Sequence, residues 1–295
     1  MKKEFGNIVF LPGPNKGRYP YCHSVLVRDS VCAVIDPAAD KELLSRVNQE
    51  EKVSAVILSH YHEDHRMYMG IFSDAELWVP HADAPPFEDL DLFMEWYGMT
   101  DPEEISAWKA VLRTQFNFRE RTPERIFHDG QVLMVGRTPV QVVHTPGHTP
   151  GHCCFYFPEQ QVLFLADIDL TRFGPWYGDK YSSIDDFIAS VEKVRNIPAR
   201  YFITAHEDGI FQEDPGDLWD EYLAVIDKRE QKLKEFIRKP RTMEEIVQAR
   251  IVYKKPREPK TFYDFAERVT MLKHLERMAE QGEVELNMGR YRLLE

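Results

Sequence analysis

Cysteine is scarce in this sequence, which has four cysteines among 295 residues. They are Cys22, Cys32, Cys153 and Cys154. Disulfide-stapled secreted domains use cysteine far more densely, and zinc ribbons space it in repeated pairs. Neither arrangement is present, so we expect four free structural thiols.

Long apolar runs are also missing. No stretch approaches the roughly 20 apolar residues that a helix needs to cross a bilayer. The apolar run at residues 8–11 is much shorter than the core of a secretion signal, and Pro12 and Gly13 interrupt it. We therefore expect a cytoplasmic protein that has no membrane partner.

Positive charge is in short supply through most of the chain. Before Lys228 there are 20 basic and 37 acidic residues, whereas from Lys228 onward there are 17 basic and 12 acidic residues. An acidic body repels phosphate backbones at long range, and a basic tail does not. The charge pattern favours a small substrate for the body and leaves nucleic acid open as a partner of the tail.

Low-complexity tracts are absent, and contents of 43% hydrophobic and 29% charged residues are typical of an ordinary globular protein. Short runs rich in β-branched and aromatic residues, bounded by Gly, Pro or Asp, predict strands. These runs cover residues 7–11, 23–29, 31–37, 53–59, 75–80, 131–135, 140–144, 153–157, 161–167 and 200–206.

Helical patterns lie between the predicted strands. Residues with good N-cap side chains precede three of them: Asp40 before 41–51, Asp101 before 103–116, and Ser183 before 184–196. Together with the strands, these helices predict an α/β domain with much antiparallel sheet.

Residues 81–118 resemble an insertion that contains two helical stretches rich in Phe, Trp and Tyr. Two interpretations are open. The stretches are either a pair of helices that covers the core, or a lid or wall of a substrate pocket that excludes water and shapes specificity.

The pattern becomes more helical after Asp217. A long amphipathic stretch covers 217–237, Thr242 and Glu245 form a capping box, and a further helical stretch at 261–282 leads into a hairpin about residues 287–289. Helix, helix and hairpin in this order are typical of a winged-helix module. Such a module either packs on the main domain as a cap or joins a homodimer, or it binds DNA or RNA.

The stretch SHYHEDH, residues 59–65, follows a buried-strand pattern directly. In an extended segment His60 and His62 point to the same side, so both imidazoles can bind one ion. Asp64 and His65 follow where the chain turns, and they are placed to reach a second ion. Imidazole and carboxylate without thiolate are ligands of zinc, and of iron or manganese where the geometry allows.

Three further candidate ligands lie downstream. His148 stands between two Thr-Pro-Gly turns, Asp167 ends the run VLFLAD, and His206 ends the run YFITAH. Each candidate lies on the loop side of an apolar strand, where a packed sheet presents functional groups.

The ordered set SHYHEDH, TPGHTPGH, FLADIDL and ITAHEDG resembles the metallo-β-lactamase superfamily, in the branch of two-metal hydrolases that includes glyoxalase II. The resemblance spans roughly residues 5–230 and implies a four-layer αββα sandwich with a dinuclear site at one edge of its sheets. It implies one ion held by His60, His62 and His148, a second ion held by Asp64, His65 and His206, and Asp167 as the bridge between them.

The predicted domains are therefore a metallo-β-lactamase-like catalytic domain at 1–227, with the helical insertion at about 81–118, and a small winged-helix-like α+β domain at 228–295.

Some positions are ambiguous or depart from the family pattern. Asp169 would point to the same side of the strand as Asp167, but the family's Gly-Asp pair aligns with Ala166 and Asp167. The motif is followed by RMYMG, where relatives often have two glycines. Arg66 and Tyr68 thus occupy a region usually kept small, and we expect substrate choice to depend on them.

The remaining histidines are weaker candidates for residues of the site. His152 either orients His148 or a metal-bound water, or makes an ordinary polar contact. The others are expected to be structural or exposed, with His23 approaching the site most closely: His23, His81, His128, His144 and His274.

The resemblance implies a mechanism in which two divalent ions share a hydroxide that is nucleophilic at neutral pH. Asp64 is the expected catalytic residue, orienting the hydroxide and carrying a proton towards the leaving group. We expect two zinc ions, with iron or manganese as alternatives, and hydrolysis of an ester, thioester or lactone bond in a small intracellular acyl substrate.

Three alternatives stay open. The winged-helix-like tail favours an endoribonuclease or phosphodiesterase of the same fold, or a metal-binding regulator that contacts DNA through the C-terminal domain. Diiron redox chemistry is less favoured, because the chain has no room for the flavodoxin-like domain that usually accompanies it.

Overall fold

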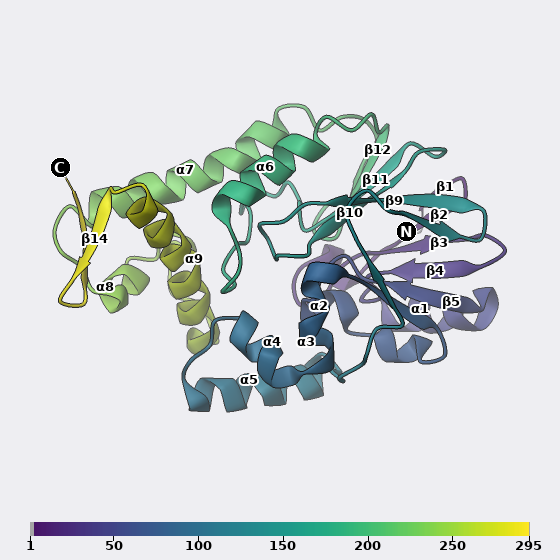
Figure 1. Cartoon of the computed structure of the whole chain (residues 1–295), viewed down its shortest axis with the longest axis horizontal. Helices are drawn as coiled ribbons and strands as arrows, with labels where there is room; N and C mark the ends of the chain where they lie inside the picture. The colour runs from purple at the N-terminus through teal and green to yellow at the C-terminus, as the bar shows by residue number, and fades with distance from the viewer. Residues whose placement is uncertain (1–2, 295) are drawn as a thin grey trace.

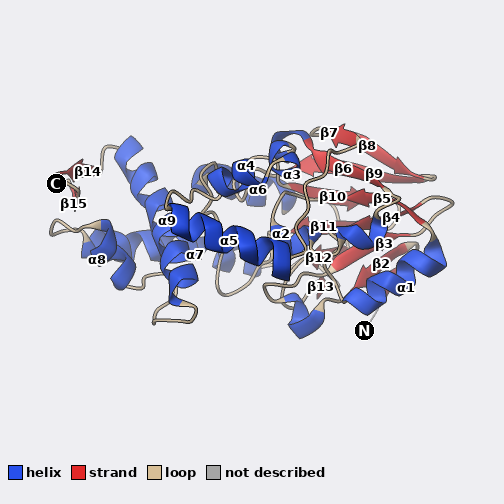
Figure 2. Ribbon diagram, turned by 90° about the horizontal axis from the view of Figure 1, so that it is seen from below, coloured by secondary structure: helices blue, strands red, loops and turns tan. Residues whose placement is uncertain are grey.

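The computed structural model describes residues 3–294, so residues 1, 2 and 295, at the outer ends of the two predicted domains, lie outside it. Two β-sheets pack against each other, with helices on their outer sides (Figure 1). Figure 2 shows the strands of the two large sheets gathered at one end of the molecule, and mainly helices with the small two-stranded C-terminal hairpin at the other.

The first sheet has seven strands in the order of the sequence. The first three pairs are antiparallel and the last three are parallel. Its strands are β1 (Lys3–Phe5), β2 (Ile8–Leu11), β3 (Ser24–Val27), β4 (Cys32–Ile35), β5 (Val53–Ile57), β6 (Glu76–Pro80) and β7 (Arg125–Phe127).

The second sheet has six strands in the order β13-β12-β11-β10-β9-β8. Only β11 and β12 are parallel neighbours in it. Its strands are β8 (Val132–Val135), β9 (Thr138–His144), β10 (Cys153–Phe157), β11 (Val162–Ala166), β12 (Tyr201–Thr204) and β13 (Ile210–Phe211).

All ten strands predicted from apolar runs are present, and three strands were missed: β1, β7 and β13. Each of the three is an edge strand of only two or three residues. An edge strand covers little core, so its sequence carries no long apolar run, and it forms because a neighbouring strand offers hydrogen bonds.

Alternating side chains divide the sandwich into layers. Phe155 on β10 and Phe164 on β11 join the core between the sheets, while Cys154 and Leu163 face a separate cluster beneath two helices. This period of two is the geometry of an extended strand. The predicted sandwich of two mixed sheets between helices is therefore confirmed.

The helices that cover the sheets begin at the predicted caps. Asp40, Asp101 and Ser183 each accept backbone N–H groups of the first helical turn. Such a cap typically contributes about 1 kcal/mol. The longer helices are α1 (Lys41–Glu51), α5 (Pro102–Gln115), α6 (Ile184–Val194), α7 (Leu218–Phe236) and α9 (Lys260–Glu280). The shorter ones are η1 (Pro14–Gly17), α2 (Glu63–Arg66), η2 (Met69–Phe72), η3 (His81–Asp83), α3 (Pro85–Glu88), α4 (Leu90–Trp96) and α8 (Met243–Gln248).

Residues 81–118 connect β6 to β7, which are parallel neighbours in the first sheet. Parallel neighbours require a crossover connection, and η3, α3, α4 and α5 form it. Phe87, Phe93 and Leu112 are fully buried in the core. The segment thus covers the core as one interpretation predicted, and its role as a lid or pocket wall stays a prediction.

The C-terminal region, from residue 228 to 294, consists of the later part of α7, α8, α9 and the hairpin of β14 (Val284–Asn287) and β15 (Arg290–Leu293). The predicted capping box of Thr242 and Glu245 is present. Helix α7 runs unbroken through residues 227 and 228, so no linker marks the predicted domain boundary. That boundary and the winged-helix assignment stay predictions.

Helix α9 is packed on two sides. Phe265 and Val269 join the core of the sandwich, whereas Met271 and Leu275 join the small core of the C-terminal region. Figure 1 shows α9 between the C-terminal hairpin and α4. The C-terminal region is therefore fixed against the main domain by a shared helix.

Two negative expectations can be compared with the described residues. The four cysteines are free and buried, as predicted. None of the described helices combines the length and apolarity that crossing a membrane requires.

Candidate metal centre

The ends of four strands bring all seven candidate ligands to one edge of the sandwich. The motif follows β5, His148 lies in the turn between β9 and β10, and Asp167 and His206 follow β11 and β12. They form one group of His60, His62, His148 and Asp167 and another of Asp64, His65 and His206, whose ligand atoms lie within 4.8 Å of one another in each group.

Three imidazole nitrogens converge in the first group. His60 Nε2, His62 Nδ1 and His148 Nε2 lie 2.9 to 3.2 Å from one another. A tetrahedral zinc ion with Zn–N distances of about 2.0–2.1 Å separates neighbouring nitrogens by roughly 3.3 Å. The spacing therefore fits three ligands of one small cation.

The far nitrogen of each of these rings has its own partner. His60 Nδ1 bonds to Ser59 Oγ at 2.9 Å, His62 Nε2 to Asp179 Oδ2 at 2.6 Å, and His148 Nδ1 to the Trp176 carbonyl at 2.9 Å. Because the far nitrogens donate these bonds, the neutral rings present lone pairs at the point where they converge. Facing lone pairs repel unless a cation lies between them.

A proton competes with metal at His62. Burial opposes its protonation, but the carboxylates of Asp179, Glu63 and Asp64 outweigh burial and raise the pKa of His62 to about 9. Metal binding must displace such a proton, so metal affinity increases with pH.

The second group is built in the same way. His65 Nδ1 donates to Asp36 Oδ2 at 2.9 Å, and His206 Nδ1 donates to the Gly17 carbonyl at 2.5 Å. Their Nε2 atoms face carboxylate oxygens, with His206 Nε2 at 3.6 Å from Asp64 Oδ2. Burial lowers the pKa of His206, but Asp167 and Asp64 outweigh it and raise that pKa to about 9.

Asp167 lies between the two groups. Its Oδ2 is 3.2 Å from His148 Nε2, and its Oδ1 is 2.9 Å from His65 Nε2 and 3.4 Å from His206 Nε2. Burial favours the neutral acid, but His65, His206 and His148 outweigh it and hold the pKa of Asp167 well below its usual value.

Two buried atoms of this arrangement lack hydrogen bonds in the described part of the chain. They are Asp167 Oδ1 and His65 Nε2, which lie 2.9 Å apart without forming a hydrogen bond with each other. An unsatisfied buried polar atom costs about 1–3 kcal/mol. The donor set and these two atoms therefore fit a bound cation.

Asp169, the alternative bridge, belongs to neither group. Its Oδ1 accepts the Thr171 N–H at 3.2 Å instead.

Sequence analysis missed two carboxylates that hold the ligands. Asp36 follows β4 and accepts the Ser59 N–H at 2.8 Å and the Ser59 hydroxyl at 2.6 Å, in addition to His65. Its position after a buried strand was a usable signal. Asp179 lies in an irregular loop and also accepts the Tyr61 hydroxyl at 2.6 Å, and its local sequence offers no signal.

A third missed carboxylate joins the loops of the first group. Asp83 accepts the Tyr61 N–H at 3.2 Å, the Thr149 hydroxyl at 2.6 Å and the Gly151 N–H at 2.6 Å. A Cβ on Gly151 would lie 2.6 Å from the Asp83 nitrogen, so only glycine permits this approach.

His152 hydrogen-bonds to Asp167, and its ring lies edge-on to the ring of His148, with centroids 5.4 Å apart. Its Nε2 accepts the Asp167 N–H at 3.2 Å, and its Nδ1 bonds to Thr145 Oγ1 at 2.8 Å. Burial, followed by His148, lowers the pKa of His152, which leaves Nε2 free to accept. The contact is a polar one that orients the backbone of Asp167.

The other histidines lie outside the two groups. His23 is structural: its Nδ1 accepts the Gly13 N–H at 2.9 Å, and its Nε2 lies 3.2 Å from the Glu207 carbonyl beside His206. The rings of His81 and His128 contact each other, His144 bonds to a backbone carbonyl, and His274 is buried on α9.

Arg66, which directly follows the motif, is packed between aromatic rings. Its guanidinium lies over the rings of Phe87 and Phe118, at 4.6 and 4.3 Å from their centroids, and donates to the Arg119 carbonyl at 2.8 Å. The residue is only 3% exposed, because aromatic residues of the crossover enclose it. The expectation that substrate choice depends on Arg66 and Tyr68 stays a prediction.

Two tyrosines fix the motif from its other side. Tyr19 donates to Glu63 at 2.8 Å, and Tyr97 on the crossover donates to the same carboxylate. The ring of Tyr19 stacks on Phe262 of α9, with centroids 5.8 Å apart. The N-terminal segment, the crossover and α9 therefore meet beside the candidate ligands.

Removing metal with a chelator is expected to destabilise the protein. Binding at 100 times the Kd stabilises a fold by about 2.7 kcal/mol per site, so chelation lowers Tm and zinc restores it. Metal affinity, measured by chelator competition, is expected to increase between pH 7 and 9. A Tm that chelation leaves unchanged would argue against both ions.

The comparisons with known proteins agree with this geometry. The family model described as "Metallo-beta-lactamase superfamily" matches residues 18–206. An acyl-coenzyme A thioesterase of Bos taurus is 28% identical over 179 residues, covering 58% of this chain and 56% of the relative. A hydroxyacylglutathione hydrolase of Haemophilus influenzae is 27% identical over 154 residues, covering 50% of this chain and 65% of the relative.

A solved metallo-beta-lactamase family protein of Thermus thermophilus has the same fold over nearly its whole length. Its TM-score is 0.73 at 22% identity, and the match covers 98% of this chain and 99% of that one. In contrast, the chain spans about 56 and 65% of the length of the two curated relatives.

Proposed function

Because the chain belongs to the metallo-β-lactamase superfamily, we propose that it is a two-metal hydrolase that cleaves an ester or thioester bond of a small acyl substrate. The observation that carries this proposal is the position of Asp167, whose two oxygens face two separate groups of histidines. The curated relatives named as a thioesterase and a hydroxyacylglutathione hydrolase support acyl cleavage.

The first group would hold one cation through three imidazoles, and the second would hold another through Asp64, His65 and His206. Imidazole and carboxylate donors suit zinc, with iron and manganese as alternatives. When bound, two such ions lower the pKa of water and polarise the bond to be cleaved.

Asp64 is the proposed catalytic residue among the side chains of this site. It is 5% exposed and lies on the first turn of α2, with its two oxygens facing His65 and His206. One oxygen can bind the cation while the other orients the attacking water, accepts its proton and passes it to the leaving group.

A basic segment favours a substrate that carries phosphate. Three exposed cations, Lys254, Lys255 and Arg257, precede α9, and a fourth, Lys260, begins it; Phe262 of this helix stacks on Tyr19 beside the motif. Phosphate groups are bound by Lys and Arg clusters of this kind. We therefore place acyl thioesters of coenzyme A ahead of simple esters and lactones.

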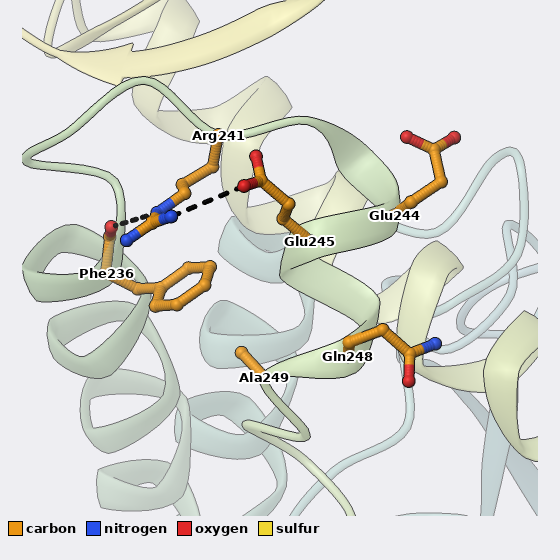
Figure 3. Close-up of a pocket in the computed structure, with 6 residues that line it drawn as sticks. All are labelled: Phe236, Arg241, Glu244, Glu245, Gln248 and Ala249. Carbon is orange, nitrogen blue, oxygen red and sulfur yellow. Dashed lines mark hydrogen bonds and ion pairs between the residues drawn. The ribbon is translucent and has the colours of Figure 1, made fainter.

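Nucleic-acid cleavage is a weaker candidate. Exposed positions of α9 such as Arg268 and Glu276 are separated by buried ones, and a helix packed on two sides cannot enter a groove. One hollow of the C-terminal region, of about 430 Å³, is also unsuited to phosphate, because it presents two glutamates and its one arginine pairs with Glu245 (Figure 3). Its lining residues are Phe236, Arg241, Glu244, Glu245, Gln248 and Ala249.

A substrate panel tests the proposal. The zinc-loaded protein is assayed with an acyl-coenzyme A, the matching acyl-pantetheine, a hydroxyacylglutathione, a lactone, a phosphodiester and RNA. We expect thioester turnover, with acyl-coenzyme A favoured over acyl-pantetheine. RNA cleavage without acyl turnover would overturn the proposal. Salt-sensitive DNA binding without any turnover would favour the regulator instead.

A further inference from the structure

We propose that the C-terminal region positions the first group of ligands through Arg229, which holds the loop that orients His62 and His148. The inference rests on the proposed metal centre. It assigns the C-terminal region a role in metal binding. This role does not depend on which substrate the protein cleaves.

The loop at residues 171–182 connects the site to the C-terminal region and contains no helix or strand. The Trp176 carbonyl accepts the Nδ1–H of His148 at 2.9 Å, and Asp179 accepts the Nε2–H of His62 at 2.6 Å. The hydroxyl of Ser182 also donates to the His148 carbonyl at 2.6 Å. Two of the three imidazoles of the first group therefore depend on this loop for their orientation.

An irregular loop has no hydrogen-bond ladder of its own, so other contacts must fix its backbone. Arg229 on α7 provides them from outside the site. It donates to the Phe173 and Pro175 carbonyls at 2.7 Å each and to the Tyr177 hydroxyl at 3.0 Å. These three contacts lie on both sides of Trp176, whose carbonyl holds His148.

The side chain of Arg229 is buried and enclosed by aromatic rings at this position. It is 4% exposed, and its guanidinium lies 5.0 Å from the ring centroid of Phe173 and 5.5 Å from that of Tyr177. Its hydrogen bonds go to carbonyls and a hydroxyl, not to a carboxylate. Burying a cation is costly unless it is hydrogen-bonded, and the planar guanidinium can bond several carbonyls at fixed angles.

Helix α9 supports the same loop. Its buried His274 accepts the Tyr177 hydroxyl at 2.9 Å through Nε2, and its Lys273 donates to the Lys180 carbonyl at 2.6 Å. The C-terminal region thus holds the loop at Phe173, Pro175, Tyr177 and Lys180.

The second group lies outside this network. His65 is oriented by Asp36, which follows β4, and His206 is oriented by the Gly17 carbonyl near the N-terminus. Loss of the Arg229 contacts should therefore weaken the binding of one ion more than the binding of the other. A role limited to general stability would not produce that difference.

The test is a metal titration of the full chain with Arg229→Met. Cobalt is added stepwise to metal-free protein, the visible absorption of each site is followed, and competition with a chelator gives the two dissociation constants. Mutating an outer partner of a ligand typically weakens metal affinity by about 10–100-fold. We expect a loss of this size at one site and a change of less than about threefold at the other.

Arg241→Met is the matched control. Arg241 also lies in the C-terminal region, over the Phe236 ring at 4.6 Å, and donates to the Phe236 carbonyl at 3.4 Å, but it does not contact the loop. We expect wild-type affinities at both sites in this variant.

Tyr177→Phe keeps the test decisive if Arg229→Met does not fold. It removes only the hydroxyl that joins Arg229 to His274 and keeps the buried ring, and it should also weaken one site selectively. Equal weakening at both sites, or wild-type affinity in a folded variant, would overturn the inference. A wild-type protein that binds fewer than two ions would instead count against the proposed function.

Discussion

The Asp167→Asn variant is expected to lose at least one of the two ions and more than about 100-fold of its hydrolytic rate. The carboxylate faces His148 with one oxygen and His65 with the other. Asparagine has nearly the same shape but no charge, so it supplies one good ligand oxygen and leaves the buried histidines without a neutralising anion. Loss of an outer partner already weakens metal binding by about 10–100-fold, and loss of a ligand should do more.

Asp169→Asn is the matched control for this variant. Asp169 lies two residues away in the same loop and binds the Thr171 N–H. We expect the metal content and the turnover of Asp169→Asn to be close to those of the wild type. If Asp169→Asn lost metal and Asp167→Asn kept it, the bridging role would belong to Asp169.

The Asp64→Asn variant separates metal binding from proton transfer. We expect it to retain part of its metal, because His65 and His206 would still hold the second ion of the proposed pair, and Asp167 still supplies an oxygen at 2.9 Å from His65. We expect hydrolysis to fall by about 10²–10⁴-fold, the range of a positioned acid or base. Metal content and single-turnover rates on the same sample measure the two effects.

A pH profile adds a second readout for Asp64. Asparagine cannot titrate, so the limb of the profile that depends on this carboxylate should disappear in the variant. Wild-type turnover by Asp64→Asn with normal metal content would remove Asp64 from the mechanism.

The candidate ligands could be identified from sequence because their signals are local. His60 and His62 are two residues apart in an extended segment, so strand geometry alone places them on one side. Asp167 and His206 end apolar runs, and the resemblance to a known order of motifs joined them to the others. Helix caps such as Asp40 and Ser183 were equally local, since a cap acts within one turn.

The residues that orient the candidate ligands could not be predicted from local sequence in this way. Asp36 contacts His65, which lies 29 positions away in the sequence, and Asp179 contacts His62, which lies 117 positions away. A single acid in a loop has no periodicity, so nothing in its neighbourhood shows what it will meet. The burial of Arg66 between Phe87 and Phe118 has the same origin, because its partners come from the crossover.

The sequence by itself therefore determined most of the strands, the caps and the candidate metal ligands, because those depend on neighbours along the chain. Only the tertiary structure decided which carboxylates orient the imidazoles and that α9 serves two cores at once. The physical reason is that an outer partner is selected by distance and burial after folding. Arg229 is the clearest case, since only folding brings it beside the loop that holds His148.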